Sequence, residues 1–168
     1  MPGDTIRVVL ADDHTVVRAG LRPVLGTAKD ISVIGEASPG REALALVERL
    51  SPDVLITDLS MPEMDGTETT KAIVARKLPT KILVLTMHVE EEYLVPLMEA
   101  GANGYLVKSA ADRELVAAVR AVAYGDTYVS HGASGVLIKG LRRKDPVQEE
   151  RDRYESLTQR ERDVLRFV

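Results

Sequence analysis

Five short apolar runs recur along the first part of the chain, and each is followed by a stretch whose apolar residues have helical spacing. These runs predict strands at 6–11, 31–37, 54–58, 81–86 and 104–107. Helices are predicted from residue 15 onward and over 41–50, 67–77, 90–100 and 109–124. Strict alternation of strands and helices predicts an α/β fold, with a five-stranded parallel sheet covered by helices on both faces.

Four residues are expected to affect where the predicted helices bend, begin or end. Pro23 lies near the end of the first helix, where its missing backbone donor should loosen the last turn. Pro96 lies inside the fourth and removes the bond to the carbonyl of Glu92, which predicts a kink or a late start and a more mobile helix. Gly101 predicts a left-handed stop after that helix. Ser109 is predicted to cap the fifth helix.

Beyond residue 124 the alternation stops, so we predict three segments: an α/β domain over 1–124, a linker over 125–155 and the first helix of an incomplete domain over 156–168. A short helix within 129–141 would fit the linker's apolar residues, and the charged stretch that follows contains Pro146. Thr158 and Glu161 have the spacing of a capping box before the last apolar residues.

The composition excludes several classes of protein. Hydrophobic residues make up 45% and charged residues 29%, which are ordinary values for a soluble globular protein. The absence of cysteine excludes disulfides and thiolate metal sites, and no membrane span or secretory signal is recognisable, so a cytoplasmic location is expected. The net charge of −4 includes no strong basic excess in any part, which argues against a free-standing nucleic-acid binder.

Polar residues stand where four of the predicted strands end: Asp12 and Asp13, Asp58, Thr86, and Lys108. These groups should meet in one crevice, because parallel strands end at the same edge of a sheet. Crowded carboxylates repel one another unless a cation joins them, and oxygen-only ligation suits Mg²⁺. An ammonium and a hydroxyl would contact further phosphoryl oxygens. The set therefore predicts phosphoryl transfer to a carboxylate, with Asp58 as the nucleophile.

Each of these residues has a simpler interpretation when taken alone. Asp12 with Asp13, and also Asp58, could cap a following helix. Thr86 alone would be structural and Lys108 alone a solvated lysine. Only their joint placement favours a site. His14 and His88 are interpreted as surface histidines, although His14 could approach the site.

The chain resembles a bacterial two-component response regulator of the NarL/FixJ (LuxR-type) group. The matching motifs are L-A-D-D-H at 10–14, D-L-S-M-P-x-M-D-G at 58–66, L-T at 85–86, A-G-A-N-G-Y-L-V-K at 100–108 and L-T-Q-R-E-R-D-V-L at 157–165. The resemblance implies a flavodoxin-like receiver with strand order 2-1-3-4-5. The last motif resembles the opening of a LuxR-type helix-turn-helix domain and covers only its first helix.

The resemblance also implies roles for the residues at the crevice. Asp58 would accept the phosphoryl group from a sensor histidine kinase in the presence of Mg²⁺. Asp13 would bind the metal directly, Asp12 through water, and Ser60 through its backbone carbonyl. Lys108 would pair with the phosphoryl group.

Two further residues would report phosphorylation. Thr86 would move toward the phosphoryl group and Tyr105 would rotate inward, although Tyr105 could also be a half-buried core residue without such a role. Phosphorylation would promote a homodimer that brings two DNA-binding domains together. This chain holds no recognition helix, so DNA would be bound only through the full-length C-terminal domain.

The implied function is that of a transcription regulator and not of an enzyme, but two alternatives stay open. An aspartate-nucleophile phosphatase would use the same residue types, yet it usually carries a second acid at the position of Ser60. A stand-alone receiver would serve only as a dimerisation or phosphate-sink module, and phosphorylation would then leave DNA affinity unchanged.

Overall fold

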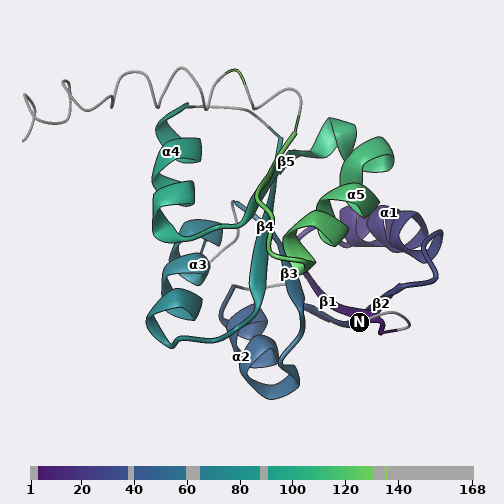
Figure 1. Ribbon diagram of the computed structural model, residues 1–168, viewed down its shortest axis with the longest axis horizontal. Coiled ribbons are helices and arrows are strands. Elements are labelled where there is room, and N and C mark those ends of the chain that lie inside the picture. Colours follow the sequence, from purple (N-terminus) through teal and green to yellow (C-terminus); the bar gives the residue numbers. More distant parts are fainter. Residues whose placement is uncertain (1–3, 38–39, 60–64, 88–90, 131–134, 136–168) are drawn as a thin grey trace, which may run out of the picture.

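The computed structural model describes residues 4–37, 40–59, 65–87, 91–130 and 135. One sheet stands between two layers of helices (Figure 1). The strands are β1 (Ile6–Ala11), β2 (Ile31–Ala37), β3 (Val54–Asp58), β4 (Lys81–Thr86), β5 (Gly104–Val107) and β6 (Tyr128–Val129). The helices are α1 (Thr15–Gly26), α2 (Gly40–Leu50), α3 (Gly66–Ala75), α4 (Glu91–Ala100) and α5 (Ala111–Ala123), with a 3₁₀ turn, η1 (Lys108–Ala110), before α5.

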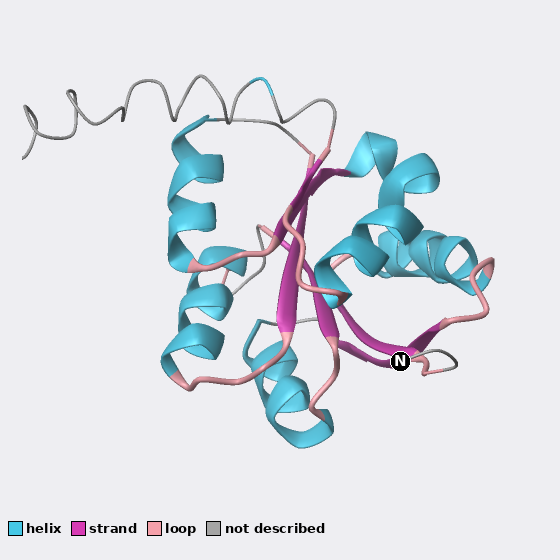
Figure 2. Ribbon diagram, in the orientation of Figure 1, coloured by secondary structure: helices cyan, strands magenta, loops and turns pink. Residues whose placement is uncertain are grey.

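All strand pairs of the sheet are parallel, and their order is β2-β1-β3-β4-β5-β6. The five predicted strands are present with the predicted bounds, and their predicted order is confirmed. The prediction of five strands is corrected in one respect: β6 adds a sixth strand beside β5. Figure 2 shows the sheet in magenta with helices on both sides of it. A strand of two residues is too short to show any alternation in the sequence, which is why it was not predicted.

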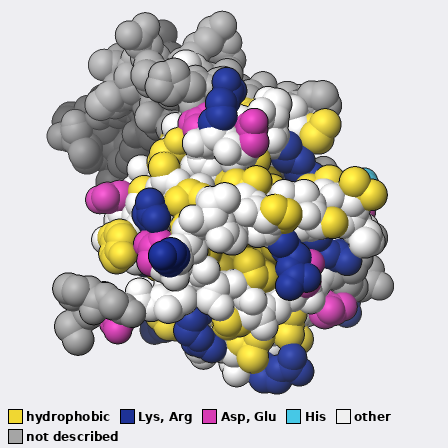
Figure 3. Space-filling view, turned by 90° about the vertical axis from the view of Figure 1, so that its right-hand side faces the viewer, with side chains coloured by type: hydrophobic (Ala, Val, Ile, Leu, Met, Phe, Trp, Pro, Cys, Tyr) yellow, Lys and Arg dark blue, Asp and Glu magenta, His cyan; other side chains and the backbone are white. Residues whose placement is uncertain are grey.

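The strands carry apolar residues on both faces because each face is covered by helices. In β1, Val8 and Leu10 pack in the core under α1 and α5, whereas Val9 and Ala11 pack under α2, α3 and α4. Figure 1 shows these two groups of helices on opposite sides of the sheet. Figure 3 shows the face of α1 and α5, where apolar, basic and acidic side chains are interspersed. The burial of both faces explains why each strand is a continuous apolar run.

The beginnings of two helices show how local chemistry sets their first residues. Asp65 caps α3, because its carboxylate accepts a hydrogen bond from the backbone nitrogen of Glu68 at 2.8 Å. The predicted cap of α5 is wrong. Ser109 lies inside η1, and Ala110 occupies the N-cap position without a side-chain bond. The 3₁₀ turn takes up the residues after β5 and moves the start of α5 to Ala111.

Both prolines lie inside helices. α1 continues past Pro23 to Gly26, after which Thr27 and Ala28 donate to the carbonyls three residues before them. Pro96 lies on the exposed side of α4, between the buried Leu94 and Leu97. The described part of the helix begins at residue 91, and residue 90, the expected start, lies outside the described residues. A kink at Pro96, and the mobility of α4, stay predictions.

Gly101 adopts a positive φ of 116° directly after α4, as the sequence indicated. Its backbone nitrogen donates to the carbonyl of Met98 at 3.1 Å. A Cβ added here would lie 2.7 Å from Cγ2 of Val74 in α3. The position therefore requires glycine both for its backbone conformation and for its contact with α3.

Replacing Gly101 by alanine is expected to destabilise the fold by about 2 kcal/mol, since a positive φ is strained for residues with a Cβ. Urea unfolding followed by circular dichroism would measure the change. Gly20→Ala is the matched control, because Gly20 is exposed in α1 and a Cβ there meets no atom within 4 Å. An equal loss in both variants would contradict this explanation.

The short strand β6 ties the end of the domain to β5. Ser130 donates its backbone nitrogen to the carbonyl of Tyr105 at 2.9 Å, and its Oγ accepts a hydrogen bond from the nitrogen of Val107 at 3.3 Å. Because Val129 belongs to β6, the helix expected within 129–141 does not begin there. Of the rest of that segment the structure describes only residues 130 and 135, and residue 135 is helical. The linker over 136–155 and the predicted helix over 156–168 lie outside the described residues.

Tyr128 donates its hydroxyl to Oε1 of Glu114 at 2.6 Å. Burial and this bond to a carboxylate raise the pKa of Tyr128 to about 12 from an ordinary 10.0. The raised pKa means that folding favours the neutral phenol, so the contribution to stability is complete below pH 10 and is lost as the pH rises toward 12.

Tyr128→Phe is therefore expected to flatten the fall of stability with pH in this window, as measured by urea unfolding across it. Tyr124→Phe serves as the control, since Tyr124 is exposed at the end of α5. A fall that is unchanged in Tyr128→Phe would show that other groups cause it.

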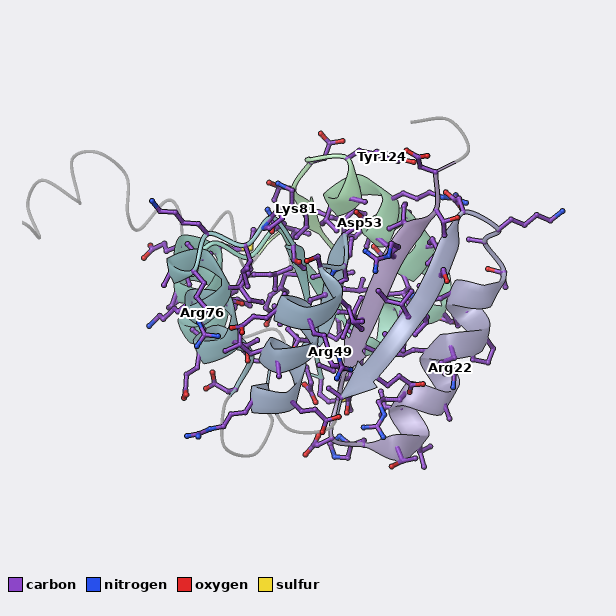
Figure 4. The ribbon with its side chains drawn as sticks, turned by 90° about the horizontal axis from the view of Figure 1, so that it is seen from below. Arg22, Arg49, Asp53, Arg76, Lys81 and Tyr124 are labelled. Atoms are coloured by element: carbon purple, nitrogen blue, oxygen red, sulfur yellow. The ribbon has the colours of Figure 1, made fainter. Side chains whose placement is uncertain are left out.

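The amino-terminal edge of the sheet is held by backbone contacts. Asp53 accepts a hydrogen bond from the backbone nitrogen of Arg7 at 2.8 Å, and its carbonyl accepts one from the nitrogen of Lys81 at 2.9 Å. Figure 4 shows Asp53 and Lys81 at this edge. Among the described residues, none of the helices has the length and apolarity that a membrane span requires. The polar strand ends lie at the opposite edge.

Candidate functional site

The carboxyl edge of the sheet brings the predicted residues to neighbouring strand ends. Asp58 pairs in register with Leu85, the residue before Thr86. Thr86 in turn pairs with Val107, the residue before Lys108. Asp12 directly follows β1, and β1 pairs with β3 on the side of β3 that faces away from β4. The parallel register therefore places all four positions at one edge.

Lys108 joins two of the carboxylates. Its Nζ lies 2.9 Å from Oδ2 of Asp58 and 3.0 Å from Oδ2 of Asp12. The Lys108 side chain is only 9% exposed and that of Asp12 only 3%. Burial alone would lower the pKa of Lys108, but the hydrogen bond to Asp58 and the close negative charges of Asp58 and Asp12 outweigh it and raise the pKa above 10.5. Lys108 is therefore a paired cation inside the crevice and not a solvated surface lysine.

Neither Asp12 nor Asp58 serves as a helix cap. His14 occupies the N-cap position of α1 and makes no capping bond through its side chain, while α3 is capped by Asp65. Oδ1 of Asp12 instead accepts a hydrogen bond from the backbone nitrogen of His14 at 2.8 Å, within the loop. The simpler interpretation of these carboxylates as caps is wrong.

The acidic cluster suits a hard cation. Asp12, Asp13, His14 and Asp58 each place one potential ligand atom within 4.8 Å of the others. Oδ2 of Asp12 and Oδ1 of Asp13 are buried and accept no hydrogen bond from the part of the chain that the structure describes. Oδ2 of Asp12 is close to Lys108, but the contact lacks hydrogen-bond geometry. Buried carboxylate oxygens with unused acceptor capacity fit a divalent ion such as Mg²⁺.

Arg18 supports the loop that carries the acidic pair, and the sequence reasoning did not identify it. Its guanidinium donates to the backbone carbonyl of Asp12 and, at 3.4 Å, to that of Ala37, while its Nε lies 3.4 Å from Glu36. The available signal was a basic residue one turn into the helix that follows the acidic loop. The side chain links the ends of β1 and β2 behind the cluster.

Thr86 and Tyr105 lie on one face of the sheet. Tyr105 belongs to the core under α2, α3 and α4 together with Val84, and Thr86 shares that face because it follows Val84 by two residues in β4. The Tyr105 side chain is fully buried, whereas the simpler interpretation of this residue assumed half-burial. The structure therefore places an inward tyrosine on a strand next to that of Thr86.

Gly66 keeps the loop after β3 close to Asp58. Its nitrogen donates to the carbonyl of Leu59 at 2.7 Å, and an added Cβ would lie 2.7 Å from the backbone oxygen of Asp58. This contact with backbone could not be relieved by a side-chain movement. Ser60 and His88 lie outside the described residues, so the predicted carbonyl ligand is not placed.

A comparison with known proteins places this geometry in a family. The model of the response regulator receiver domain matches residues 8–120. The transcriptional regulatory protein LiaR of Bacillus subtilis is 42% identical over 163 residues, which cover 97% of this chain and 76% of LiaR. The nitrate/nitrite response regulator protein NarL of Escherichia coli K12 is 37% identical over 161 residues, covering 96% of this chain and 74% of NarL.

Solved structures agree with these relatives. The receiver domain of the putative response regulator NarL from Mycobacterium tuberculosis has a TM-score of 0.71 and 36% identity, and the match covers 73% of this chain and 98% of that domain. A structure of two RcsB dimers bound to two parallel DNAs has a TM-score of 0.74 and 30% identity, covering 81% of this chain and 69% of RcsB. The chain thus belongs to the response-regulator receiver family and, within it, to the NarL/LuxR-type group of two-component transcription factors.

Proposed function

We propose that the chain is a phosphorylation-controlled switch in which Asp58 accepts a phosphoryl group from a sensor histidine kinase. One observation carries the proposal: Nζ of Lys108 holds Asp58 at 2.9 Å and Asp12 at 3.0 Å, at the edge where four parallel strands end. An ammonium and clustered carboxylates are the groups that phosphoryl transfer to an aspartate requires.

The transfer forms one bond and breaks another. A carboxylate oxygen of Asp58 attacks the phosphorus of the kinase's phosphohistidine, the P–N bond breaks, and the imidazole leaves as a base that takes up a proton. The product is an acyl phosphate on Asp58. Lys108, already fixed by Asp12, contacts an oxygen of the transferred group and offsets its charge.

Asp12, Asp13 and Asp58 would hold a Mg²⁺ ion. This agrees with the general behaviour of receiver domains, which bind Mg²⁺ in an acidic pocket. When bound, Mg²⁺ neutralises charge on the phosphoryl oxygens. Oδ1 of Asp13 supports a direct role for that residue, since it is a buried oxygen that accepts no hydrogen bond from any described residue. The backbone carbonyl of Ser60 is a further proposed ligand, and it lies outside the described residues.

Thr86 and Tyr105 are the proposed reporters of phosphorylation. The hydroxyl of Thr86 would move toward the phosphoryl oxygens and shift an equilibrium between two states of the domain. Tyr105 is already fully buried, so a switch that turns this ring inward would act by stabilising the position seen here. The face that they share is covered by α4, which would therefore respond first.

The output would be DNA binding by a dimer. LiaR is described as a transcriptional regulatory protein, and RcsB is seen as dimers bound to DNA. By extension, phosphorylation of this chain would favour a homodimer, and two-fold protein symmetry would match paired DNA half-sites. The DNA contacts would come from a C-terminal domain whose first helix is predicted over 156–168.

The test is incubation with acetyl phosphate and Mg²⁺, followed by intact-mass and size analysis. The chain should gain one phosphoryl group with Mg²⁺ and none with a chelator, and beryllofluoride should shift its size toward a dimer. No mass gain with Mg²⁺ would contradict the proposal. Sustained hydrolysis of small phosphate esters would favour the phosphatase alternative, and unchanged DNA affinity of a full-length form would favour the phosphate-sink alternative.

A further inference from the structure

His14 turns its imidazole toward the acidic cluster. Its side chain is 63% exposed, yet Nδ1 lies 3.1 Å from Oδ1 of Asp12 and 3.0 Å from Oδ1 of Asp13. The same nitrogen lies 4.0 Å from Oδ2 of Asp58. A nitrogen thus stands among the three carboxylates that the proposed function assigns to Mg²⁺.

A hydrogen bond of Nδ1 with Oδ1 of Asp12 at 3.1 Å accounts for only one of its two close carboxylate contacts. Nδ1 carries at most one hydrogen, whether the imidazole is neutral or protonated, so it can donate to only one of the two oxygens. Oδ1 of Asp12 already accepts the backbone nitrogen of His14 at 2.8 Å. Oδ1 of Asp13 is buried and accepts no hydrogen bond from the described residues. In the neutral tautomer that carries its hydrogen on Nε2, Nδ1 presents a lone pair to both carboxylate oxygens, and a shared cation would satisfy the nitrogen and the oxygens together.

The three distances from Nδ1 can be compared with those between ligands of one octahedral ion. Ligands at about 2.1 Å from such an ion lie about 3.0 Å apart when adjacent and about 4.2 Å apart when opposite. The separations of Nδ1 from the Asp12 and Asp13 oxygens match adjacent ligands, and its 4.0 Å separation from Oδ2 of Asp58 matches an opposite one. The position of Nδ1 relative to the three carboxylates is therefore compatible with ligation of a shared ion.

The loop that presents these ligands is held from behind. The backbone nitrogen of Asp12 donates to the carbonyl of Ala37 at 3.1 Å, and Arg18 donates to the carbonyl of Asp12. His14 itself is the N-cap of α1, and its carbonyl accepts a hydrogen bond from the backbone nitrogen of Arg18 at 3.1 Å. Ligands fixed in this way lose little conformational entropy when they bind an ion.

We propose that His14 is a nitrogen ligand of this site and gives it a preference for a divalent first-row transition ion, such as Mn²⁺, over Mg²⁺. Imidazole is a good ligand for transition ions, whereas Mg²⁺ takes oxygen ligands and retains its waters. The proposal rests on the proposed function for the identity of the carboxylate ligands, but it requires no phosphoryl transfer. His14 would set which ion the receiver holds.

The test compares the 168-residue chain with His14→Ala and Val16→Ala. Val16 is a matched control, because it is highly exposed in the first turn of α1 and offers no ligand atom. In calorimetric titrations, His14→Ala should lose about tenfold or more in Mn²⁺ affinity and much less in Mg²⁺ affinity. Val16→Ala should match the wild type for both ions.

A spectroscopic measurement separates ligation from a general effect on charge. Pulsed electron paramagnetic resonance of the Mn²⁺-bound chain should show hyperfine coupling to an imidazole nitrogen, which should be absent in His14→Ala. The proposal is overturned if the wild type shows no nitrogen coupling, or if His14→Ala weakens Mn²⁺ and Mg²⁺ equally. Nitrogen coupling in a chain that accepts no phosphoryl group would support this site while contradicting the proposed function.

Discussion

Asp58→Asn is expected to abolish phosphorylation of the chain by acetyl phosphate, while the fold is retained. The amide has nearly the shape of the carboxylate but is not a nucleophile at neutral pH. Its oxygen can still accept a hydrogen bond from Lys108, which lies 2.9 Å from Oδ2 in the native chain. Intact-mass analysis after incubation with Mg²⁺ should show one added phosphoryl group in the wild type and none in the variant.

Asp126→Asn provides the control for this substitution. Asp126 is exposed just after α5, so the change removes the same charge without touching the site. This variant should be phosphorylated as the wild type is. A mass gain in Asp58→Asn equal to that of the wild type would show that another residue is the acceptor.

Lys108→Ala is expected to lower the free energy of unfolding by roughly 3 kcal/mol in the absence of divalent ions, the cost of breaking a buried ion pair. The substitution leaves Asp12 and Asp58 as buried carboxylates without their shared cation. Because the pKa of Lys108 is raised in the fold, the loss should be complete below pH 10.5 and should shrink only as the wild-type lysine titrates above it.

Added Mg²⁺ should restore part of this stability, since an ion bound only by the folded state stabilises it. Urea unfolding with and without Mg²⁺ would measure both effects. Lys71→Ala is the control, because Lys71 is exposed on α3, outside the crevice. A loss in Lys108→Ala that is as small as in the control would mean that the ion pairs contribute little to the fold.

The strands could be predicted from the sequence because each is buried on both faces. A buried parallel strand is a continuous apolar run, and its end is marked by a polar residue such as Asp58 or Thr86. One missed feature depends on a contact between distant segments, since β6 exists because Tyr128 and Val129 pair with β5. The other is local, because a 3₁₀ turn that includes Ser109 precedes α5.

The convergence of the site residues was predictable for a similar reason, since strand ends in a parallel sheet share an edge. The partners of each side chain were not predictable. Lys108 could have pointed to solvent, and its ion pairs with Asp12 and Asp58 depend on the three-dimensional course of the chain after β5. The sequence indicated only that His14 could approach the site, and it did not identify Arg18, whose contacts with Asp12 and Ala37 appear only in the structure.

The strand β6 determines how the chain leaves the domain. Ser130 is fully buried and bonded at both its nitrogen and its Oγ to β5, the strand that carries Tyr105 and leads to Lys108. These two bonds fix both the position and the backbone direction of the chain at Ser130. A movement of β5 would therefore also move Ser130, and with it the point from which the following residues continue.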